Sequence, residues 1–471
     1  MLMKKLINKI RFFTALYLGK CAIYLLRFTG SGGTSFPGKL AMTICPDILR
    51  ELGAKYRIFM VTGTNGKTTT ARIMEQILQE NRIKYISNKS GANLISGLIT
   101  TLISDVKLNA SPTSPTALLE VDEAAFRLSS KHIHPAVLVV TNFFRDQLDR
   151  YGELYNTLNV VKEGILNNPE TTLVLNGDDS LCASLGKDVP NPVVYYGMDE
   201  LAVPEDNNRT MSSINNDASY CLYCKTKYEY QYYSYGHLGY FKCPNCGYER
   251  PELTANVVRI PAMTSEFSTV VISTPSGVFE ANINLPGLYN IYNALSAVAF
   301  AEVLGFSHKK TIEALSSFES GFGRMESISL GENNIQVILI KNPTGFSQVL
   351  KYLSSVYNSS VICFMINDNI ADGRDISWLY DVDFEPLKNM QDNVSQIYVS
   401  GTRAEDMAVR LKYAGIFTDH VSIEKDAQNM LDFALDTLKP GETLFILPTY
   451  TALLDIRKIL KKRFKLKNFW Q

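Results

Sequence analysis

The sequence has neither a membrane-spanning apolar run nor an export signal. No apolar run reaches the roughly 20 residues that a helix needs to cross a bilayer. The best candidate, residues 12–28, is interrupted by Lys20 and ends near Arg27, and it has no small-residue cleavage site of an export signal. We therefore expect a cytoplasmic protein in a reducing compartment, and we expect no disulfide framework among the eight cysteines.

Acidic residues are absent from the first 46 residues, which contain seven Lys or Arg, although the formal net charge of the chain is zero. The last 17 residues again contain seven basic side chains. Two interpretations of residues 12–28 stay open. They form either a helix packed on the protein or a basic amphipathic segment at the inner face of an anionic membrane. For both basic ends, simple solvation is the alternative.

The cysteines divide into two groups. Four are scattered among apolar neighbours and are expected in the core: Cys21, Cys45, Cys182 and Cys363. The others form two C-x2-C pairs separated by 18 residues: Cys221, Cys224, Cys243 and Cys246. Four thiolates with no open position predict structural Zn²⁺ in a zinc ribbon inserted at residues 218–252. The neighbourhood is rich in Tyr and poor in Lys and Arg, so nucleic acid is not an expected partner.

Short apolar runs alternate with helical periodicity over most of the 471 residues. This alternation predicts parallel strands linked by helices, and the length requires more than one domain. The predicted strands occupy residues 57–63, 117–121, 136–142, 172–179, 336–342, 360–368, 396–401 and 443–449. We expect a basic N-terminal segment of residues 1–45, an α/β domain of residues 46–323 and a second α/β domain of residues 324–471.

The stretch "MVTGTNGKTTTARIMEQIL" (60–78) predicts a phosphate-binding loop between a strand and a helix. Backbone N–H groups in such a loop converge on phosphate oxygens, and the helix N-terminus adds partial positive charge. Lys67 is expected to neutralise the terminal phosphates, and Thr68 is expected to bind Mg²⁺. The pattern is shorter than an ordinary Walker A motif, because Val61 replaces its first glycine. The expected nucleotide-binding residues are Gly63, Thr64, Asn65, Gly66, Lys67, Thr68 and Thr69.

"GTNGKTTT" resembles the ATP loop of the Mur ligases and folylpolyglutamate synthases. These enzymes activate a carboxylate as an acyl phosphate, which an amine attacks. The resemblance implies a Mur-ligase-type P-loop ATPase domain with a parallel sheet, followed by a Rossmann-like α/β domain. It also implies that Glu120 is associated with Mg²⁺; a purely structural acid is the alternative, although an acid in such a strand is costly without a cation.

Two further positions follow from the same resemblance. "LPGLYNIYNALSAVAF" matches the helix in which Asn290 would contact adenine, with helix capping as the alternative role. "GFGRME" places Arg324 where the related ligases have an arginine that reaches the nucleotide phosphates.

Three positions depart from the ligase pattern. Gln147 stands where related ligases have a metal-binding His, and Lys162 is one residue out of place for a carbamylated lysine. Ile338 replaces an Asp that precedes Asn-Pro at the start of the C-terminal domain. The nucleotide contact from that domain must therefore differ.

Over essentially its full length, the chain is similar to the family of ligase subunits (MurT) of lipid II isoglutaminyl synthase. "NDNIADGRDISWLYDVDFE" and "LPTYTALLDIRKIL" carry part of this resemblance. It implies ATP-dependent amidation of the α-carboxyl of D-glutamate in the stem peptide of lipid II, giving D-isoglutamine. Such an enzyme is a carbon–nitrogen ligase of peptidoglycan synthesis that uses glutamine as the amido donor.

The ammonia is expected to come from a separate GatD-type glutaminase in a heterodimer. None of the four unpaired cysteines lies in the tight glycine turn that a nucleophilic Cys requires, and the chain has only five His. The resemblance further implies that this subunit lends an acid to the partner's Cys–His pair. We favour Asp368, with helix capping as the alternative role for this group of acids: Asp368, Asp372, Asp375, Asp381 and Asp383.

The expected catalytic residues are thus Lys67, Glu120 and Asp368, with ATP, Mg²⁺ and Zn²⁺ as cofactors. Two rival functions remain. A folylpolyglutamate-synthase-like or other amino-acid ligase would share the ATP loop and attach an amino acid. A non-catalytic zinc-ribbon nucleotide-binding switch would bind ATP and form no amide.

Overall fold

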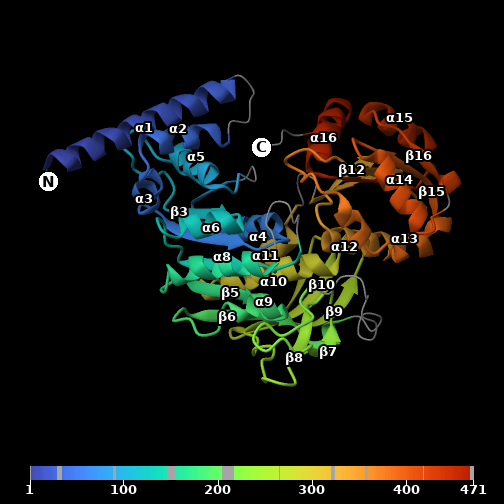
Figure 1. Cartoon of the computed structure of the whole chain (residues 1–471), viewed down its shortest axis with the longest axis horizontal. Helices are drawn as coiled ribbons and strands as arrows, with labels where there is room; N and C mark the ends of the chain where they lie inside the picture. The colour runs from blue at the N-terminus through green and yellow to red at the C-terminus, as the bar shows by residue number, and fades with distance from the viewer. Residues whose placement is uncertain are drawn as a thin grey trace.

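Two helix-covered sheets divide the chain into a larger N-terminal body and a C-terminal body (Figure 1). The structure is a computed structural model. It describes residues 2–28, 34–88, 92–145, 154–203, 217–264, 266–319, 324–355, 359–416 and 418–466. The predicted arrangement of α/β units in two sheets is confirmed.

Nine strands of the described residues form the first sheet, in the order β11-β10-β9-β6-β5-β4-β1-β3-β2. Strands β2 to β6 and β1 are parallel to their neighbours, β9 is parallel to β6, and β10 and β11 continue antiparallel. The bounds are β1 Arg57–Thr62, β2 Tyr85–Ser87, β3 Thr116–Glu120, β4 Val137–Val140, β5 Thr172–Asn176, β6 Val193–Met198, β9 Ala255–Met263, β10 Ser268–Thr274 and β11 Gly277–Ile283. All four strands predicted for this body are confirmed.

Continuous apolar runs form the central strands because both faces of the sheet are covered. In β1, Phe59 and Val61 join one core, whereas Ile58 and Met60 join the other. Helices α4 and α10 contribute to the first core, and α3 and α5 to the second. The helices of this body are α1 Leu2–Phe28, α2 Phe36–Ile44, α3 Ile48–Gly53, α4 Lys67–Glu80, α5 Ile95–Asp105, α6 Glu123–Ser129, α8 Leu154–Leu166, α9 Ser180–Ser184, α10 Leu288–Val303 and α11 His308–Ser316.

The C-terminal sheet has the order β12-β13-β17-β14-β15-β16, with only the β12–β13 pair antiparallel. Its strands are β12 Arg324–Leu330, β13 Asn333–Ile338, β14 Ser360–Met365, β15 Val394–Ser400, β16 Val421–Ile423 and β17 Thr443–Pro448. The helices are α12 Pro343–Ser355, α13 Glu385–Asn389, α14 Ala404–Tyr413, α15 Ala427–Thr437 and α16 Tyr450–Phe464. The four strands predicted here are also present.

A small module carries the four paired cysteines and contains the hairpin of β7 (Glu229–Tyr233) and β8 (Gly239–Lys242). It packs at the edge of the first body, below the C-terminal body in the view of Figure 1. Its own core includes Tyr228 and Phe241, together with Ala183 of α9. The module therefore depends on the first body for part of its buried surface.

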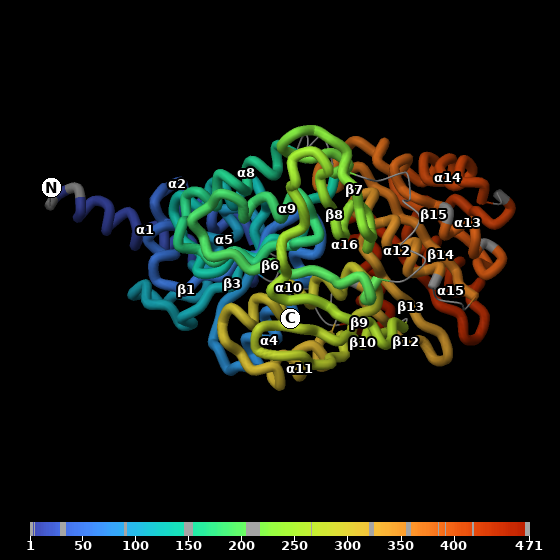
Figure 2. The backbone as a smooth tube through the Cα atoms, turned by 90° about the horizontal axis from the view of Figure 1, so that it is seen from below, coloured from blue at the N-terminus to red at the C-terminus, as the bar shows by residue number. Residues whose placement is uncertain are grey.

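Helix α1 extends beyond the first body at its N-terminal end (Figures 1 and 2). Phe12, Leu16 and Ala22 are buried against the body, and the opposite face is exposed. The expectation that Cys21 lies in the core is wrong, because Cys21 falls on the exposed face. Among the residues that the structure describes, no helix combines the length and apolar character needed to span a membrane.

Candidate functional site

The predicted phosphate loop lies at the carboxyl end of β1 and leads directly into α4. Gly63 and Gly66 have φ values of +117° and +82°, which favour glycine. A Cβ at Gly66 would also collide with the side chain of Asn293 on α10. The glycines of the motif are therefore required by backbone conformation and by the close approach of α10.

Lys67 is folded back into this loop. Its Nζ donates hydrogen bonds to the carbonyl oxygens of Gly63 and Thr64 and lies 3.1 Å from Oε1 of Glu123. The side chains of Lys67 and Glu123 are only 10% and 5% exposed. The buried carboxylate of Glu123 thus neutralises Lys67, the lysine that the motif predicts will bind phosphate.

Glu123 was not predicted, although it lies three residues after Glu120. Burial raises the pKa of Glu123, while the positive charge of Lys67 opposes this rise. The positive charge of Lys341, in the C-terminal body, likewise lowers the pKa of Glu123. Positive charges from both bodies therefore favour the ionised form of this buried carboxylate.

Glu120 ends β3, where its backbone lies in register with Val61 of β1. It is 7% exposed, and its Oε1 accepts a hydrogen bond from Asn93 over 3.4 Å. Asp122, close by, caps α6 by accepting from two backbone N–H groups. A buried acid beside the ATP loop fits a magnesium-associated role, with the hydroxyl of Thr68 at the start of α4 as the second oxygen donor.

Asn290 and Asn293 lie together on α10, and Asn293 Nδ2 donates to Asn290 Oδ1 over 3.2 Å. Asn290 is not the capping residue, because Gly287 occupies that position. Its Nδ2 donates to the carbonyl of Pro286 over 2.7 Å and lies 3.5 Å from Sδ of Met325. The predicted adenine contact is thus near the junction of the two bodies.

The C-terminal body reaches the ATP loop through Asn342. Asn342 Nδ2 donates to Oδ1 of Asn65 over 2.7 Å, and Asn342 Oδ1 accepts from the backbone of Gly345. Ile338 is buried in the core of the C-terminal body, where an ionised Asp would lack solvent. Asn342, four residues later, instead connects this body to the ATP loop through its hydrogen bond with Asn65.

The structure gives little on the side chains at three further positions singled out from the sequence: Arg324, Gln147 and Lys162. Arg324 begins β12 and pairs with Ile338 in register, but its side chain lies outside the described part of the chain. Gln147 also lies outside the described residues. Lys162 lies half-buried in α8.

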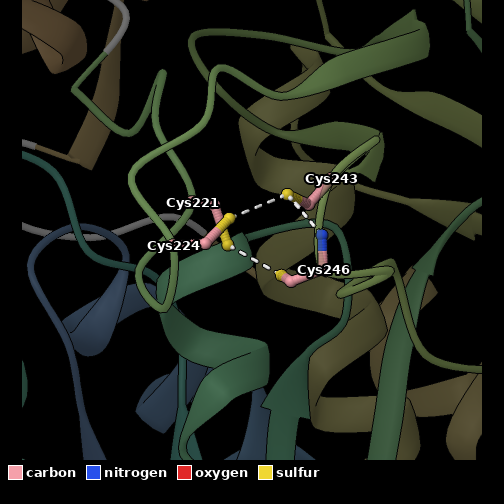
Figure 3. Close-up of side chains that lie close together, drawn as sticks. All are labelled: Cys221, Cys224, Cys243 and Cys246. Atoms are coloured by element: carbon pink, nitrogen blue, oxygen red, sulfur yellow. Dashed lines mark hydrogen bonds between the residues drawn. The ribbon is translucent and has the colours of Figure 1, made fainter.

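The four paired cysteines converge on one point (Figure 3). Their sulfur atoms all lie within 4.8 Å of one another, with Sγ–Sγ distances of 3.5 Å for Cys221–Cys246 and 3.3 Å for Cys224–Cys243. Zinc–sulfur bonds of about 2.3 Å in a tetrahedron place sulfur pairs about 3.8 Å apart. The cluster therefore fits a structural zinc ion.

Asp368 follows β14 and lies at the carboxyl edge of the C-terminal sheet. It accepts from the Thr402 hydroxyl over 2.9 Å and pairs with Arg403 over 2.8 Å. The Thr402 hydrogen bond and the charge of Arg403 lower the pKa of Asp368. Of its neighbours, Asp372 is buried and accepts from Thr451 at the start of α16, which is a capping role.

The chain matches two protein families in separate segments. The family described as Mur ligase middle domain matches residues 61–247, and the family described as MurT ligase C-terminal matches residues 339–453. Together the two segments include the ATP loop, the four cysteines and most of the C-terminal body.

Named relatives extend this similarity along the chain. The lipid II isoglutaminyl synthase (glutamine-hydrolyzing) subunit MurT of Streptococcus pneumoniae is 35% identical over 95% of this chain and 96% of its own length. The subunit of the same description from Staphylococcus aureus strain COL is 33% identical, over 97% of this chain and 99% of its own. Among solved structures, a pseudomurein peptide ligase type C from Methanothermus fervidus has a TM-score of 0.66 at 22% identity, covering 89% of this chain and 81% of that chain.

Proposed function

The chain belongs to the MurT family of ligase subunits, and on this premise we propose that it amidates lipid II at the expense of ATP. The reaction converts the α-carboxyl of D-glutamate in the stem peptide to the amide of D-isoglutamine. ATP and ammonia are consumed, and ADP and phosphate are released. The observation that carries the proposal is the hydrogen bond by which Asn342 of the C-terminal body contacts Asn65 of the ATP loop.

The substrate carboxylate attacks the γ-phosphorus of ATP and forms an acyl phosphate, with ADP as the leaving group. Lys67 and Arg324 stabilise the charge on the transferring phosphoryl group. Thr68 and Glu120 would hold Mg²⁺, which would supply further charge neutralisation. Ammonia then attacks the acyl carbon, and loss of phosphate and a proton gives the amide. Contact between the two bodies shields the acyl phosphate from water.

Lys67 must exchange partners during this cycle. Before nucleotide binds, its ammonium group is neutralised by Glu123, and bound phosphates offer a stronger set of acceptors. Glu123 therefore keeps the lysine inside the loop until ATP arrives. Asn290 contacts adenine at the other end of the nucleotide.

Ammonia comes from a GatD-type glutaminase subunit, and Asp368 is the acid that orients the partner's histidine. Its position at the carboxyl edge of an open sheet supports this role. Asp368 would then release Arg403 and accept from the imidazole N–H of the partner. The four cysteines bind Zn²⁺ in a structural role.

The subunit works at the inner face of the membrane, where lipid II presents its head group. The exposed large apolar residues of α1 are spaced by whole helical turns or lie next to one another: Met3, Leu6, Ile7, Ile10, Tyr17, Leu18, Tyr24, Leu25 and Phe28. This spacing puts them on one face, opposite the buried Phe12 and Leu16. Lys9, Arg11 and Arg27 border the stripe. An apolar stripe with basic borders is typical of helices that lie in an anionic membrane surface.

The decisive experiment incubates lipid II with this chain, ATP and ammonium, with and without the glutaminase and glutamine. Mass spectrometry is expected to show conversion of one acid to an amide, with one phosphate released per amide. Phosphate release that requires an amino acid in place of ammonia would favour the folylpolyglutamate-type ligase. ATP binding without amide or phosphate under any amine supply would overturn the proposal in favour of a nucleotide switch.

A further inference from the structure

The turn between β7 and β8, residues 234–238, packs against the segment that supports the ATP loop. The ring of Tyr235 stacks on Phe144 with a centroid distance of 5.8 Å, and the ring of His237 lies 4.7 Å from Phe144. Phe144 in turn donates its backbone N–H to Oγ1 of Thr64 over 3.2 Å and accepts from that hydroxyl over 3.3 Å. The turn is thus separated from the ATP loop by a single residue.

A buried carboxylate strengthens this connection. Nε2 of His237 lies 3.2 Å from Oδ1 of Asp179, and both side chains are fully buried. The other oxygen of Asp179 accepts from the backbone N–H of Phe143 over 2.7 Å. Asp179 therefore links the turn to the backbone immediately before Phe144, so a shift of His237 displaces the support of Thr64.

The same turn contacts the second wall of the site, α10. The hydroxyl oxygens of Ser234 and Tyr292 are 2.7 Å apart, and the rings of Tyr235 and Tyr292 pack edge-to-face. Tyr292 lies on α10 two residues after Asn290, the residue predicted to contact adenine. One turn therefore holds both the ATP loop and the helix opposite it.

Gly236, at the tip, brings the turn to the junction with the C-terminal body. Its φ is +58°, and a Cβ built there would lie 2.8 Å from the ring of Phe144 and 3.8 Å from Cγ2 of Thr344 in α12. A side chain larger than hydrogen would push against Phe144. Glycine is thus required for contact as well as for conformation.

We propose that residues 234–238 are a positioning element of the ATP site, through which the four-cysteine module sets the geometry of Thr64 and α10. The inference rests on the proposed function in one respect, because its ligand is MgATP. His237, Gly236 and Tyr235 touch no reacting atom, so they act through Asp179 and Phe144. The module thereby acquires a role in nucleotide affinity in addition to its own folding.

The test compares Gly236→Ala with Gly331→Ala. Gly331 has a similar φ of +62° and no atom within 4 Å of its built Cβ, so both substitutions impose the same backbone strain but only the first displaces Phe144. We expect Gly236→Ala to weaken MgATP binding about tenfold in calorimetry. The KM for ammonium should change no more than in Gly331→Ala, and the weaker MgATP binding of Gly236→Ala should persist at temperatures where both variants are fully folded.

A second pair of variants tests the hydrogen bond between His237 and Asp179: Leu at position 237 removes it and Gln can keep it. His237→Leu should weaken MgATP binding, and His237→Gln, which retains an N–H donor, should restore most of it. Unchanged MgATP affinity in Gly236→Ala and His237→Leu would overturn the proposal, as would losses that merely follow the loss of thermal stability. Nucleotide affinity is measured without lipid II, so failure of the proposed amidation is recognised separately.

Discussion

Asn342 of the C-terminal body donates a hydrogen bond from Nδ2 to Oδ1 of Asn65 in the ATP loop over 2.7 Å. Asn65 is fixed from the other side by Asn142, whose Oδ1 accepts from the backbone N–H of Asn65 over 2.9 Å. The loop is therefore held between the two bodies. Any opening of the junction must break the contact between Asn342 and Asn65.

We predict that loss of this contact lowers kcat. Asn342→Asp keeps the acceptor for the backbone N–H of Gly345 and removes the donor to Asn65, whereas Asn65→Ala removes the acceptor. A double-mutant cycle on ATP-dependent amidation should give a coupling energy of roughly 1 kcal/mol. Additive losses would show that the two side chains act independently.

Glu123→Gln should destabilise the nucleotide-free protein by about 3 kcal/mol, because it leaves a buried lysine without its counter-charge. Bound MgATP replaces that charge, so the gain in melting temperature on adding MgATP should be larger than in the wild type. The matched control is Glu120→Gln, in which the gain should shrink, since the proposed metal ligand is lost. Equal gains in all three proteins would contradict the assigned roles.

Sequence reasoning found those parts of the site that are local in the chain. Lys67 and the four cysteines follow from short spacings, and Glu120 follows from the family resemblance; the structure brings each to the expected element. Asn342 could not be predicted from its motif, because its partner lies 277 residues away. Glu123 gave no signal beyond its position near Glu120, since only the fold shows that it is buried beside Lys67.

The secondary structure, too, was predicted where the local sequence pattern is clear and missed where it is mixed. Strands buried on both faces, such as β14, have continuous apolar sequences and were predicted. Strand β10 was not predicted; its burial alternates from residue to residue, so its sequence mixes polar and apolar side chains. The error over Cys21 has a related origin, because α1 is apolar on two faces and only one of them is packed.

Removal of zinc should destabilise the module and the site that it supports. Cys243→Ser is expected to lose the zinc measured by elemental analysis and to lower the free energy of unfolding by several kcal/mol, since metal binding contributes directly to folding. Cys21→Ser is the control, because Cys21 is exposed and lies outside the cluster. Retention of full zinc content by Cys243→Ser would refute the four-thiolate assignment.

Asp368→Asn should lower glutamine-dependent amidation by roughly 100-fold or more and leave ammonium-dependent amidation unchanged. The pKa of Asp368 is lowered, so its carboxylate stabilises the folded state above about pH 4 and loses this effect as the pH falls further. Titration of this group should therefore not limit activity near neutral pH. Asp375→Asn is the comparison, and a selective loss of glutamine-dependent activity there instead would move the assignment to Asp375.

The exposed stripe of α1 can be tested with a matched pair of charge substitutions. Ile10→Glu and Asn8→Glu change the charge equally, but Ile10 lies on the stripe and Asn8 on the opposite, also exposed, side of the helix. If the stripe inserts into a membrane surface, Ile10→Glu loses the burial of a large apolar side chain in addition to the electrostatic effect. Its partition onto anionic phospholipid vesicles should fall roughly tenfold below that of Asn8→Glu in cosedimentation. Equal losses would mean that only charge attracts the helix, and no loss in either variant would mean that α1 does not bind the membrane.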